Sequence, residues 1–310
     1  MNPPRRIASL ISSGTEMLFV LGLGEQVVAV SHECDYPPAA QARPKATHSN
    51  IDSSQSSQTI DEQVTRLTRE GASLYGLNVE LLCDLRPDLI VTQAQCDVCA
   101  VRYADVLDLV QSQNALRGTR VVALNPQSLG DVLADIARLG EATGTVARAR
   151  DLVDSLNGRI AAVRERCASI RADERPKVVC IEWVEPLMAA GNWTPELLAI
   201  AGGESGLAQA GRHSEYCTWE SIVAYDPDVL LIAPCGFDLA RSLVEAQRLQ
   251  RLPGWSDLRA VRSGRCYVLD GNAYLNRSGP RLVESLEILA HLLHPQLFPP
   301  PPLTDAWRSA

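Results

Sequence analysis

Two short segments of this chain bring metal-ligating side chains together. The segment HECD, residues 32–35, follows an apolar run and offers an imidazole, two carboxylates and a thiol. Cys96 and Cys99 form a C-x-x-C pair after a second apolar run, and Cys235 follows a third. Two thiols at the C-x-x-C spacing can share a metal ion or form a disulfide, and thiolates favour soft metals. Cys34, Cys96, Cys99 and Cys235 are therefore a candidate metal site, provided that their loops converge.

Three interpretations of the C-x-x-C pair stay open. The two thiols could be free at the start of a helix, could contact a metal or a ligand, or could form a redox pair. No second C-x-x-C accompanies the pair, so a zinc ribbon is not indicated. The nine cysteines are odd in number and scattered, unlike a disulfide framework. The cluster at residues 32–35 could equally consist of polar loop residues and a small buried thiol.

Aromatic residues are few, at 5% of the chain, but most members of one set of six fall at expected strand ends or loops: Tyr36, Trp183, Trp193, Trp219, Phe237 and Tyr274. In open α/β sheets, ligands bind beyond the carboxyl ends of the strands. Aromatic side chains there would offer apolar surface to a large planar ligand. A polar loop at residues 12–14 and another after residue 92 are expected at the same edge. The candidate ligand-binding residues are Ser13, Tyr36, Gln93, Trp183, Trp193, Phe237 and Tyr274.

The elements that must position these residues alternate along the chain. Apolar runs such as QVVAVS and DVLLIA are separated by segments with helical periodicity, in both halves of the sequence. This alternation predicts mainly parallel sheets covered by helices on both faces. The proline-rich tail, residues 297–310, is expected to be extended along the surface.

A long helix is predicted near the middle of the chain, over residues 143–170. Apolar residues recur there at helical spacing, and roughly 28 residues would span about 40 Å. We therefore predict an α/β fold of two Rossmann-like lobes joined by a single long α-helix, with a ligand cleft between the lobes. The expected boundaries are 1–142, 143–173 and 174–310. Gly158 could break the helix, and a long helix packed within one domain is the alternative.

Composition restricts the partners of this chain. The net charge is −8 and no basic patch is visible, which argues against nucleic acid and anionic membranes. No apolar run approaches the ~20 residues of a membrane-spanning helix. The first 22 residues are typical of a strand and a helix rather than a signal peptide. As written, the chain is expected in the cytoplasm, and in the periplasm if the start codon is misassigned.

Motifs for catalysis are absent from the sequence. There is no G-x-S-x-G, H-E-x-x-H or phosphate-binding glycine-rich loop. We therefore expect a binding protein rather than an enzyme, and a redox or metal-transfer role for the cysteines stays open.

An internal repeat relates the two halves. The segment VELLCDLRPDLIVTQAQC, residues 79–96, matches WESIVAYDPDVLLIAPC, residues 219–235. Glu80 and Glu220 each lie seven residues before a proline, which is followed by aspartate, an apolar strand and a cysteine. TEMLFVLG and PELLAIAG form a second, weaker pair. Two pairs in different halves favour structural repetition.

Several of these segments together resemble a known family. RIASLISSGTEMLFVLG, CDYPP, VELLCDLRPDLIV, AAGNWTPELLAIAGGE, WESIVAYDPDVLLI and RSGPRLVESLEILAHLL occur in the order found in substrate-binding proteins of cobalamin and iron-siderophore ABC importers. The chain looks closest to the cobalamin-binding group. The resemblance implies two α/β lobes joined by one long helix, with the ligand held between them. It also implies that Glu80 and Glu220 dock onto arginines of a membrane permease.

The expected function follows from this resemblance. We expect a monomeric, non-catalytic binding protein for a corrinoid, either cobalamin or a precursor, with an ABC permease as partner if the chain is exported. The cysteines of HECDYPP, CDVCA and PCGF depart from the mainly aromatic pocket of that group. Two alternatives stay open: a cytoplasmic thiol-dependent protein that handles metals, tetrapyrroles or redox chemistry, and a protein that binds an iron chelate, siderophore or haem, for import.

Overall fold

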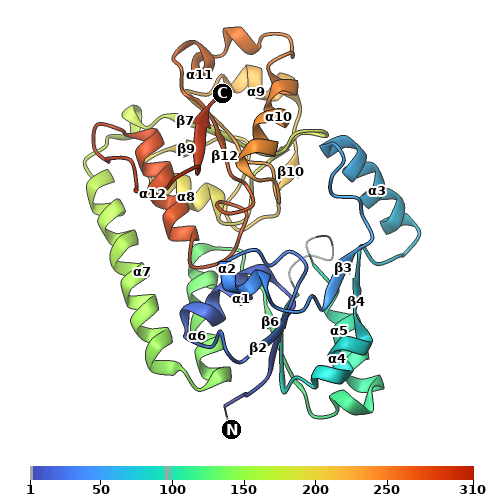
Figure 1. Ribbon diagram of the computed structural model, residues 1–310. Helices are drawn as coiled ribbons and strands as arrows, with labels where there is room; N and C mark the ends of the chain where they lie inside the picture. Colours follow the sequence, from blue (N-terminus) through green and yellow to red (C-terminus); the bar gives the residue numbers. More distant parts are fainter. Residues whose placement is uncertain (1–2, 95–97, 99) are drawn as a thin grey trace. The chain divides into compact units, whose positions relative to one another are not determined.

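The computed structural model describes residues 3–94, 98 and 100–310 (Figure 1). The chain divides into two compact units, Met1–Pro126 with Gly130–Asp154, and Gln127–Leu129 with Ser155–Ala310. Each unit combines one main β-sheet with helices, which confirms the predicted α/β class with two lobes. The predicted cleft between the lobes stays a prediction. No helix in the described part of the chain is both long and apolar enough to cross a membrane.

The first unit is built on four parallel strands in the order β2-β1-β5-β6. All five residues of β5 are buried, because helices cover the sheet. The strands are β1 (Ile7–Ser9), β2 (Val27–Val30), β5 (Leu89–Gln93) and β6 (Arg120–Leu124). The main helices are α1 (Ser12–Val20), α4 (Val79–Leu85), α5 (Tyr103–Ser112) and α6 (Leu129–Thr143), whose first residue is grouped with the second unit.

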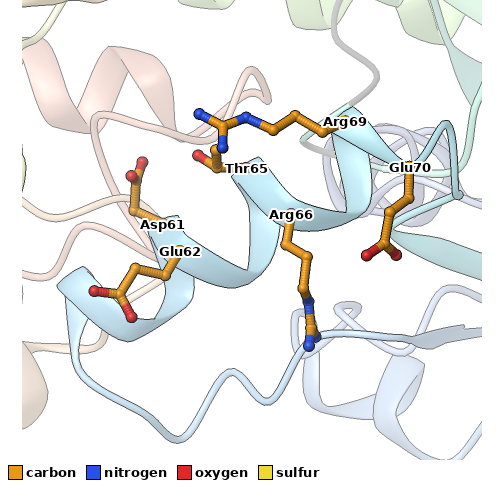
Figure 2. A pocket seen from close by; sticks show the side chains of 6 residues that line it. All are labelled: Asp61, Glu62, Thr65, Arg66, Arg69 and Glu70. Atoms are coloured by element: carbon orange, nitrogen blue, oxygen red, sulfur yellow. The ribbon is translucent and has the colours of Figure 1, made fainter.

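A smaller layer follows β2 in the same unit. It contains α2 (Pro38–Gln41), the antiparallel pair β3 (Thr47–Ser49) and β4 (Tyr75–Leu77), and α3 (Ser57–Arg69) between them. A short 3₁₀ helix at Asn114–Leu116 follows α5. Only Ser57 and Ile60 are buried on α3. A pocket of about 420 Å³ on α3 is lined by five charged residues and a threonine: Asp61, Glu62, Thr65, Arg66, Arg69 and Glu70 (Figure 2).

The second unit has a parallel centre and antiparallel edges. Its strand order is β10-β8-β7-β11-β12-β13, with β9 beside β7. The strands are β7 (Lys177–Trp183), β8 (Met188–Ala189), β9 (Glu204–Ser205), β10 (Glu215–Tyr216), β11 (Val229–Ile232), β12 (Cys266–Leu269) and β13 (Trp307–Ser309). The helices are α8 (Thr194–Ile200), α9 (Trp219–Tyr225), α10 (Leu239–Leu249), α11 (Arg259–Arg262) and α12 (Leu282–Leu293), with 3₁₀ turns at Ala172–Glu174 and Trp255–Asp257.

The antiparallel edges of this sheet correct two details of the sequence analysis. Short strands β8 and β10 were not expected, since two-residue strands carry no alternating pattern. The proline-rich tail was expected to be extended, but not to join the sheet. Its end forms β13, where Trp307 pairs with Leu269.

The predicted long helix is present as α7 (Val146–Cys167), 22 residues without a break at Gly158. It is shorter than predicted because α6 ends at Thr143 and Gly144 adopts a left-handed conformation with φ 76°. The boundary between the two units falls within α7, after Asp154. The predicted boundaries at 142 and 173 stay a prediction. Arg148 donates to the Leu21 carbonyl oxygen at 3.0 Å in the first unit.

Arg159 fastens the second half of α7 to α12 inside the second unit. Its guanidinium donates two hydrogen bonds to the Glu287 carboxylate, at 2.8 and 2.7 Å. The apolar residues on the inner side of α7 are Ala149, Leu156, Ile160, Val163 and Cys167, all buried. This spacing is that of one helix face, so α7 is amphipathic rather than buried all round.

The first prediction concerns Gly158. A Cβ placed on Gly158 meets no atom within 4 Å, so Gly158→Ala adds helix propensity without a clash. We expect the free energy of unfolding to rise by about 0.5–1 kcal/mol, measured by urea denaturation. Gly144→Ala is the matched control, because its left-handed φ of 76° should make alanine destabilising. A loss of stability in Gly158→Ala comparable to that of Gly144→Ala would contradict the prediction.

A buried carboxylate in α6 makes stability depend on pH. Asp135 is buried, and its Oδ1 accepts a hydrogen bond from Arg138 at 2.8 Å. Its Oδ2 has no hydrogen-bond partner among the described residues. Burial raises the pKa of Asp135 from its ordinary 3.8 to about 6, although Arg138 and the Asn125 backbone N–H oppose the shift. Compared with the unfolded chain, the folded chain therefore favours the protonated form of Asp135.

The second prediction follows from the sign of this shift. Because the folded pKa is the higher one, Asp135 contributes stability below pH 3.8 that is lost as the pH rises through about 6. Asp135→Asn should remove this loss and raise the free energy of unfolding at pH 7 by at most about 3 kcal/mol. Denaturation at pH 4, 5, 6 and 7 measures it. Arg138→Gln should raise the pKa of Asp135 further, and so shift the loss of stability to higher pH, because Arg138 lowers that pKa. If the free energy of unfolding of Asp135→Asn depended on pH as steeply as that of the wild type, Asp135 would not cause this pH dependence.

Candidate functional site

The candidate site of the first unit lies at the carboxyl edge of its sheet, the edge where the parallel strands end. Ser13 was expected in a loop but lies in the first turn of α1, which begins at Ser12 and is separated from the end of β1 by two residues. Ser13 and Gln93, the last residue of β5, are both buried. Tyr36 is 41% exposed and lies between β2 and α2. Of the predicted residues in this unit, Tyr36 therefore presents the most surface to a ligand.

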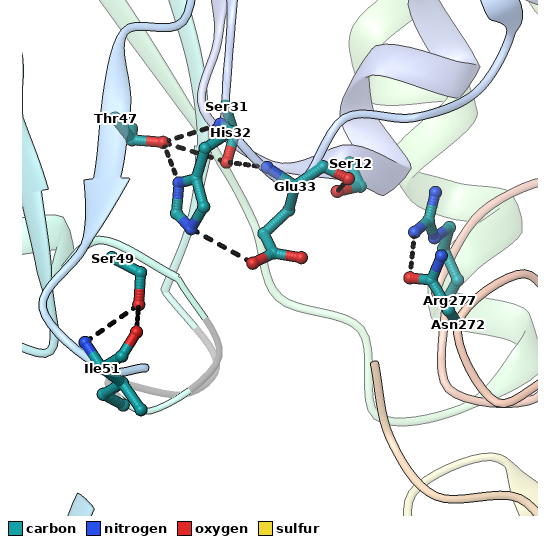
Figure 3. A network of polar contacts seen from close by, with 9 residues as sticks. All are labelled: Ser12, Ser31, His32, Glu33, Thr47, Ser49, Ile51, Asn272 and Arg277. Atoms are coloured by element: carbon teal, nitrogen blue, oxygen red, sulfur yellow. Dashed lines mark hydrogen bonds and ion pairs between the residues drawn. The ribbon is translucent and has the colours of Figure 1, made fainter. Parts of the chain in front are cut away.

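A network of polar contacts follows β2 at the same edge (Figure 3). Thr47 of β3 accepts a hydrogen bond from the His32 backbone N–H at 3.0 Å and lies 2.7 Å from His32 Nδ1. Glu33 Oε1 is 3.1 Å from His32 Nε2. Ser12 donates to the Glu33 carbonyl oxygen at 3.0 Å, which joins this loop to α1. The HECD segment is thus held by two neighbouring elements.

The thiol of this segment faces the core. Cys34 is buried, and its Sγ lies 3.0 Å from Thr15 Oγ1. Burial raises the pKa of the Cys34 thiol, although the hydrogen bonds from Thr15 and Ser12 oppose the shift. A raised pKa favours the neutral thiol over the thiolate that binds metals. Cys34 is therefore suited to packing, which the sequence could not distinguish from ligation.

The structure does not place the other predicted metal ligands relative to Cys34. Cys96 and Cys99 lie outside the described residues. Cys235 belongs to the second unit, where its backbone N–H donates to the Glu182 carbonyl oxygen at 3.0 Å. Within residues 3–94, 98 and 100–310, no three His, Cys, Asp or Glu side chains are arranged to hold a metal ion. The metal site stays a prediction without structural support.

The aromatic residues of the second unit divide into accessible and buried ones. Trp183 ends β7 and is half-buried, with its ring 5.2 Å from that of Phe237. Phe237 is only 3% exposed, and the Arg241 guanidinium lies 3.5 Å above its ring centre. Trp193 is 5% exposed, and its indole N–H donates to the Leu275 carbonyl oxygen at 2.5 Å. Phe237 and Trp193 thus support the site from within, and Trp183 carries the accessible surface.

Sequence reasoning did not name Arg277, which belongs to a polar group after β12, beside the predicted Tyr274. Asp270 accepts hydrogen bonds from the backbone N–H groups of Asn272 and Ala273, at 3.0 and 2.7 Å. Arg277 is buried and donates to Asn272 Oδ1 at 2.6 Å. Burial raises the pKa of Asp270, although these backbone hydrogen bonds oppose the shift. The Asp-Gly pair at 270–271, a turn signal directly after a strand, could have indicated this group.

Tyr274 itself is half-buried. The Arg281 guanidinium lies 5.7 Å from its ring centre, at the limit of a cation–π contact. Tyr274 therefore combines aromatic surface with a nearby cation at the carboxyl edge of this sheet.

Glu80 and Glu220 occupy equivalent positions in the two units. Each lies exposed in the first turn of a seven-residue helix, α4 or α9. Asn78 and Thr218 cap these helices by accepting hydrogen bonds from backbone N–H groups, both at 3.1 Å. Since each helix leads into the amino end of its strand, its first turn lies toward the carboxyl edge of its sheet. The repeat thus places one exposed carboxylate in the first turn of an equivalent helix in each unit.

The ends of these helices also match. Arg86 and Asp226 both adopt left-handed backbone conformations, with φ 43° and 49°. Asp88, two residues later, accepts hydrogen bonds from the Arg5 and Arg6 backbone N–H groups at 2.8 and 3.1 Å. Its counterpart Asp228 accepts one from the backbone N–H of Lys177 at 2.9 Å. The same local arrangement therefore occurs twice, which supports the internal repeat.

Known proteins share this fold and parts of this sequence. The family model described as periplasmic binding protein matches residues 7–273. The Bacillus subtilis (strain 168) protein YvrC, named an uncharacterized ABC transporter substrate-binding lipoprotein, is 27% identical over 299 residues, 95% of this chain and 82% of its own. The vitamin B12-binding protein of Photorhabdus laumondii is 24% identical over 233 residues, 74% of this chain and 71% of its own.

A solved structure extends the match to three dimensions. The periplasmic heme binding protein of Pseudomonas aeruginosa superposes with a TM-score of 0.72 over 97% of this chain and 96% of its own, at 21% identity. At that identity the likeness shows the fold. Together with the family match over residues 7–273, it confirms the resemblance seen in the sequence. This chain belongs to the periplasmic binding protein family.

Proposed function

We propose that this chain binds a corrinoid, cobalamin or one of its precursors, and delivers it to an ABC importer without catalysing a reaction. The observation that carries the proposal is the similarity to a vitamin B12-binding protein over 74% of the chain. YvrC, named a substrate-binding lipoprotein, supports the transport role and a location outside the cytoplasm. The proteins named above are binding proteins, which supports a non-catalytic role.

The accessible aromatic residues support a large ligand with apolar faces. Tyr36 is 41% exposed beyond β2, and Trp183 ends β7 with its ring supported by Phe237. Aromatic rings offer flat apolar area at low entropic cost, and a polar N–H or O–H for the rim of a ligand. A corrin ring has apolar faces and amide-bearing edges, so these residues suit it.

The third prediction is a titration of the purified chain with cyanocobalamin, dicyanocobinamide, hemin and Zn²⁺, followed by absorbance and equilibrium dialysis. We expect retention of both corrinoids. Trp183→Ala should weaken corrinoid binding about 10-fold, or ~1.4 kcal/mol, because it removes a supported aromatic surface. Trp255→Ala is the matched control, since Trp255 stacks on Trp219 at 6.1 Å in the helical layer. Retention of hemin but of neither corrinoid would indicate that the ligand is an iron chelate. Retention of neither hemin nor a corrinoid would contradict the proposal.

We further propose that Glu80 and Glu220 dock onto basic residues of the permease. Both carboxylates are exposed in the first turns of α4 and α9. A charge on the rim of an interface mainly guides association and orientation. With one carboxylate in each unit, the permease would contact both units, and the orientation of the bound chain would be fixed.

The fourth prediction tests this docking in the source cells. The double variant Glu80→Arg, Glu220→Arg should lower uptake of labelled cobalamin roughly 10-fold or more, while corrinoid affinity in vitro is unchanged. Glu165→Arg, at an exposed position on α7, is the matched control. Each substitution also removes a favourable charge from the first turn of a helix, which costs about 0.3–1 kcal/mol of stability per helix. Urea denaturation of the double variant measures this cost, so that it can be separated from the effect on uptake. Undiminished uptake by the double variant would rule the docking role out.

A further inference from the structure

The long helix α7 is not the only segment that crosses between the two units. The chain passes from the first unit to the second after Pro126, returns after Leu129, and crosses again after Asp154, within α7. The earlier crossing is a strap of three residues, 127–129, between β6 and α6. Because α6 begins at Leu129, its first residue belongs to the second unit and the rest of the helix to the first. Both α6 and α7 therefore cross the boundary between the units.

A carboxylate holds the chain on each side of this strap. On the side of the first unit, the Asn125 backbone N–H donates to the buried carboxylate of Asp135 in α6. On the side of the second unit, Glu196 Oε2 accepts a hydrogen bond from the Leu129 backbone N–H at 2.9 Å. Leu129 and Glu196 lie 67 positions apart in the sequence, and both belong to the second unit. The strap is thus fixed at both ends by main-chain hydrogen bonds.

Glu196 is itself held by a well-packed segment. It lies in the first turn of α8, whose first two residues are buried and whose second residue is a proline. Trp193, directly before the helix, is buried, and its indole N–H donates to the Leu275 carbonyl oxygen at 2.5 Å. The Glu196 side chain is half-buried. A hydrogen bond from a backbone N–H to a carboxylate is stronger than one between neutral groups. Glu196 therefore provides a firm attachment point for the strap.

The bond between Glu196 and Leu129 does two things at once. The Leu129 N–H belongs to the first turn of α6, where backbone N–H groups have no acceptor within the helix. A carboxylate there satisfies one of these groups and interacts favourably with the positive end of the helix dipole. An acceptor close in sequence would only cap the helix. This acceptor comes from α8, so the same bond caps α6 and fastens its first residue to α8.

We propose that Glu196 is a latch, whose bond to Leu129 fastens the strap to the second unit and thereby restrains movement of the two units relative to each other. Three residues span at most about 10 Å, so a bond at the end of the strap limits its whole length. The other crossing, α7, is one amphipathic helix, and long helices bend. A second fastened crossing opposes bending and twisting about α7. The latch is a property of the chain and does not depend on which ligand it binds.

The test uses the ligand-free chain and two readouts. Hydrogen exchange followed by mass spectrometry reports opening around Leu129. In Glu196→Ala we expect exchange there to be about 10-fold faster, because a hydrogen bond to a charged group is lost. Double electron–electron resonance measures the distance between spin labels at Asp108 on α5 and Gln247 on α10, both exposed. Labels on unnatural amino acids avoid the native cysteines. We expect a broader distance distribution in Glu196→Ala than in the wild type.

Two variants separate the latch from a general loss of structure. Glu196→Gln keeps the length of the side chain and an acceptor oxygen, so it should retain most of the protection at Leu129 and the narrow distance distribution. Glu215→Ala is the matched control, because it removes an exposed carboxylate from β10 of the same unit. It should behave as the wild type in both readouts. Urea denaturation checks that each variant is folded. If Glu196→Ala does not fold, Glu196→Asp, shorter by one methylene, takes its place with the same expectation.

Each other outcome overturns the inference. Faster exchange at Leu129 with an unchanged distance distribution would show that Glu196 only caps α6. Exchange at the wild-type rate in Glu196→Ala would show that the bond does not hold the strap. Equal broadening in Glu215→Ala would show that the effect is not specific to Glu196. Neither readout involves a corrinoid, so failure of the latch would leave the proposed function standing, and failure of corrinoid binding would leave the latch standing.

Discussion

The parallel strands at the centre of both sheets are buried on both faces. All residues of β5 and of β11 are buried and most are apolar, so these strands offer few polar side chains to a ligand. Each helix must then return the chain to the amino edge before the next strand begins. The polar loops and helix first turns that remain therefore gather at the carboxyl edge, where HECD, Trp183 and the Asp270 group lie.

The same constraint explains why one local solution occurs twice. A buried parallel strand cannot leave its backbone N–H groups without partners at its ends. Asp88 and Asp228 supply carboxylate acceptors to the backbone at the start of the neighbouring strand. The left-handed residues Arg86 and Asp226 end each preceding helix abruptly enough for proline and aspartate to follow. Glu80 and Glu220 come to equivalent positions as a consequence of this shared turn.

Burial also decides which of the reactive side chains can contact a ligand. Cys34, Cys180 and Cys266 are buried, and burial raises the pKa of each thiol, so they act as small apolar residues. His32 differs because a hydroxyl fixes one nitrogen and leaves the other without a hydrogen bond. In HECD the thiol therefore packs like a small apolar residue, and the imidazole is the polar side chain that the fold orients.

The sequence by itself determined the α/β class, the long central helix, the internal repeat and the family, because these depend on periodicity and on the order of motifs. Only the tertiary structure decided which site residues are accessible. The sequence alone predicts both Trp183 and Trp193 as ligand-binding residues. In the structure Trp193 is buried, and its indole N–H donates to the Leu275 carbonyl oxygen, 82 positions away. The orientation of the His32 ring likewise depends on Thr47, which lies 15 positions away in the sequence on β3. Burial and hydrogen-bond partnership are set by contacts distant in sequence, and local pattern does not contain them.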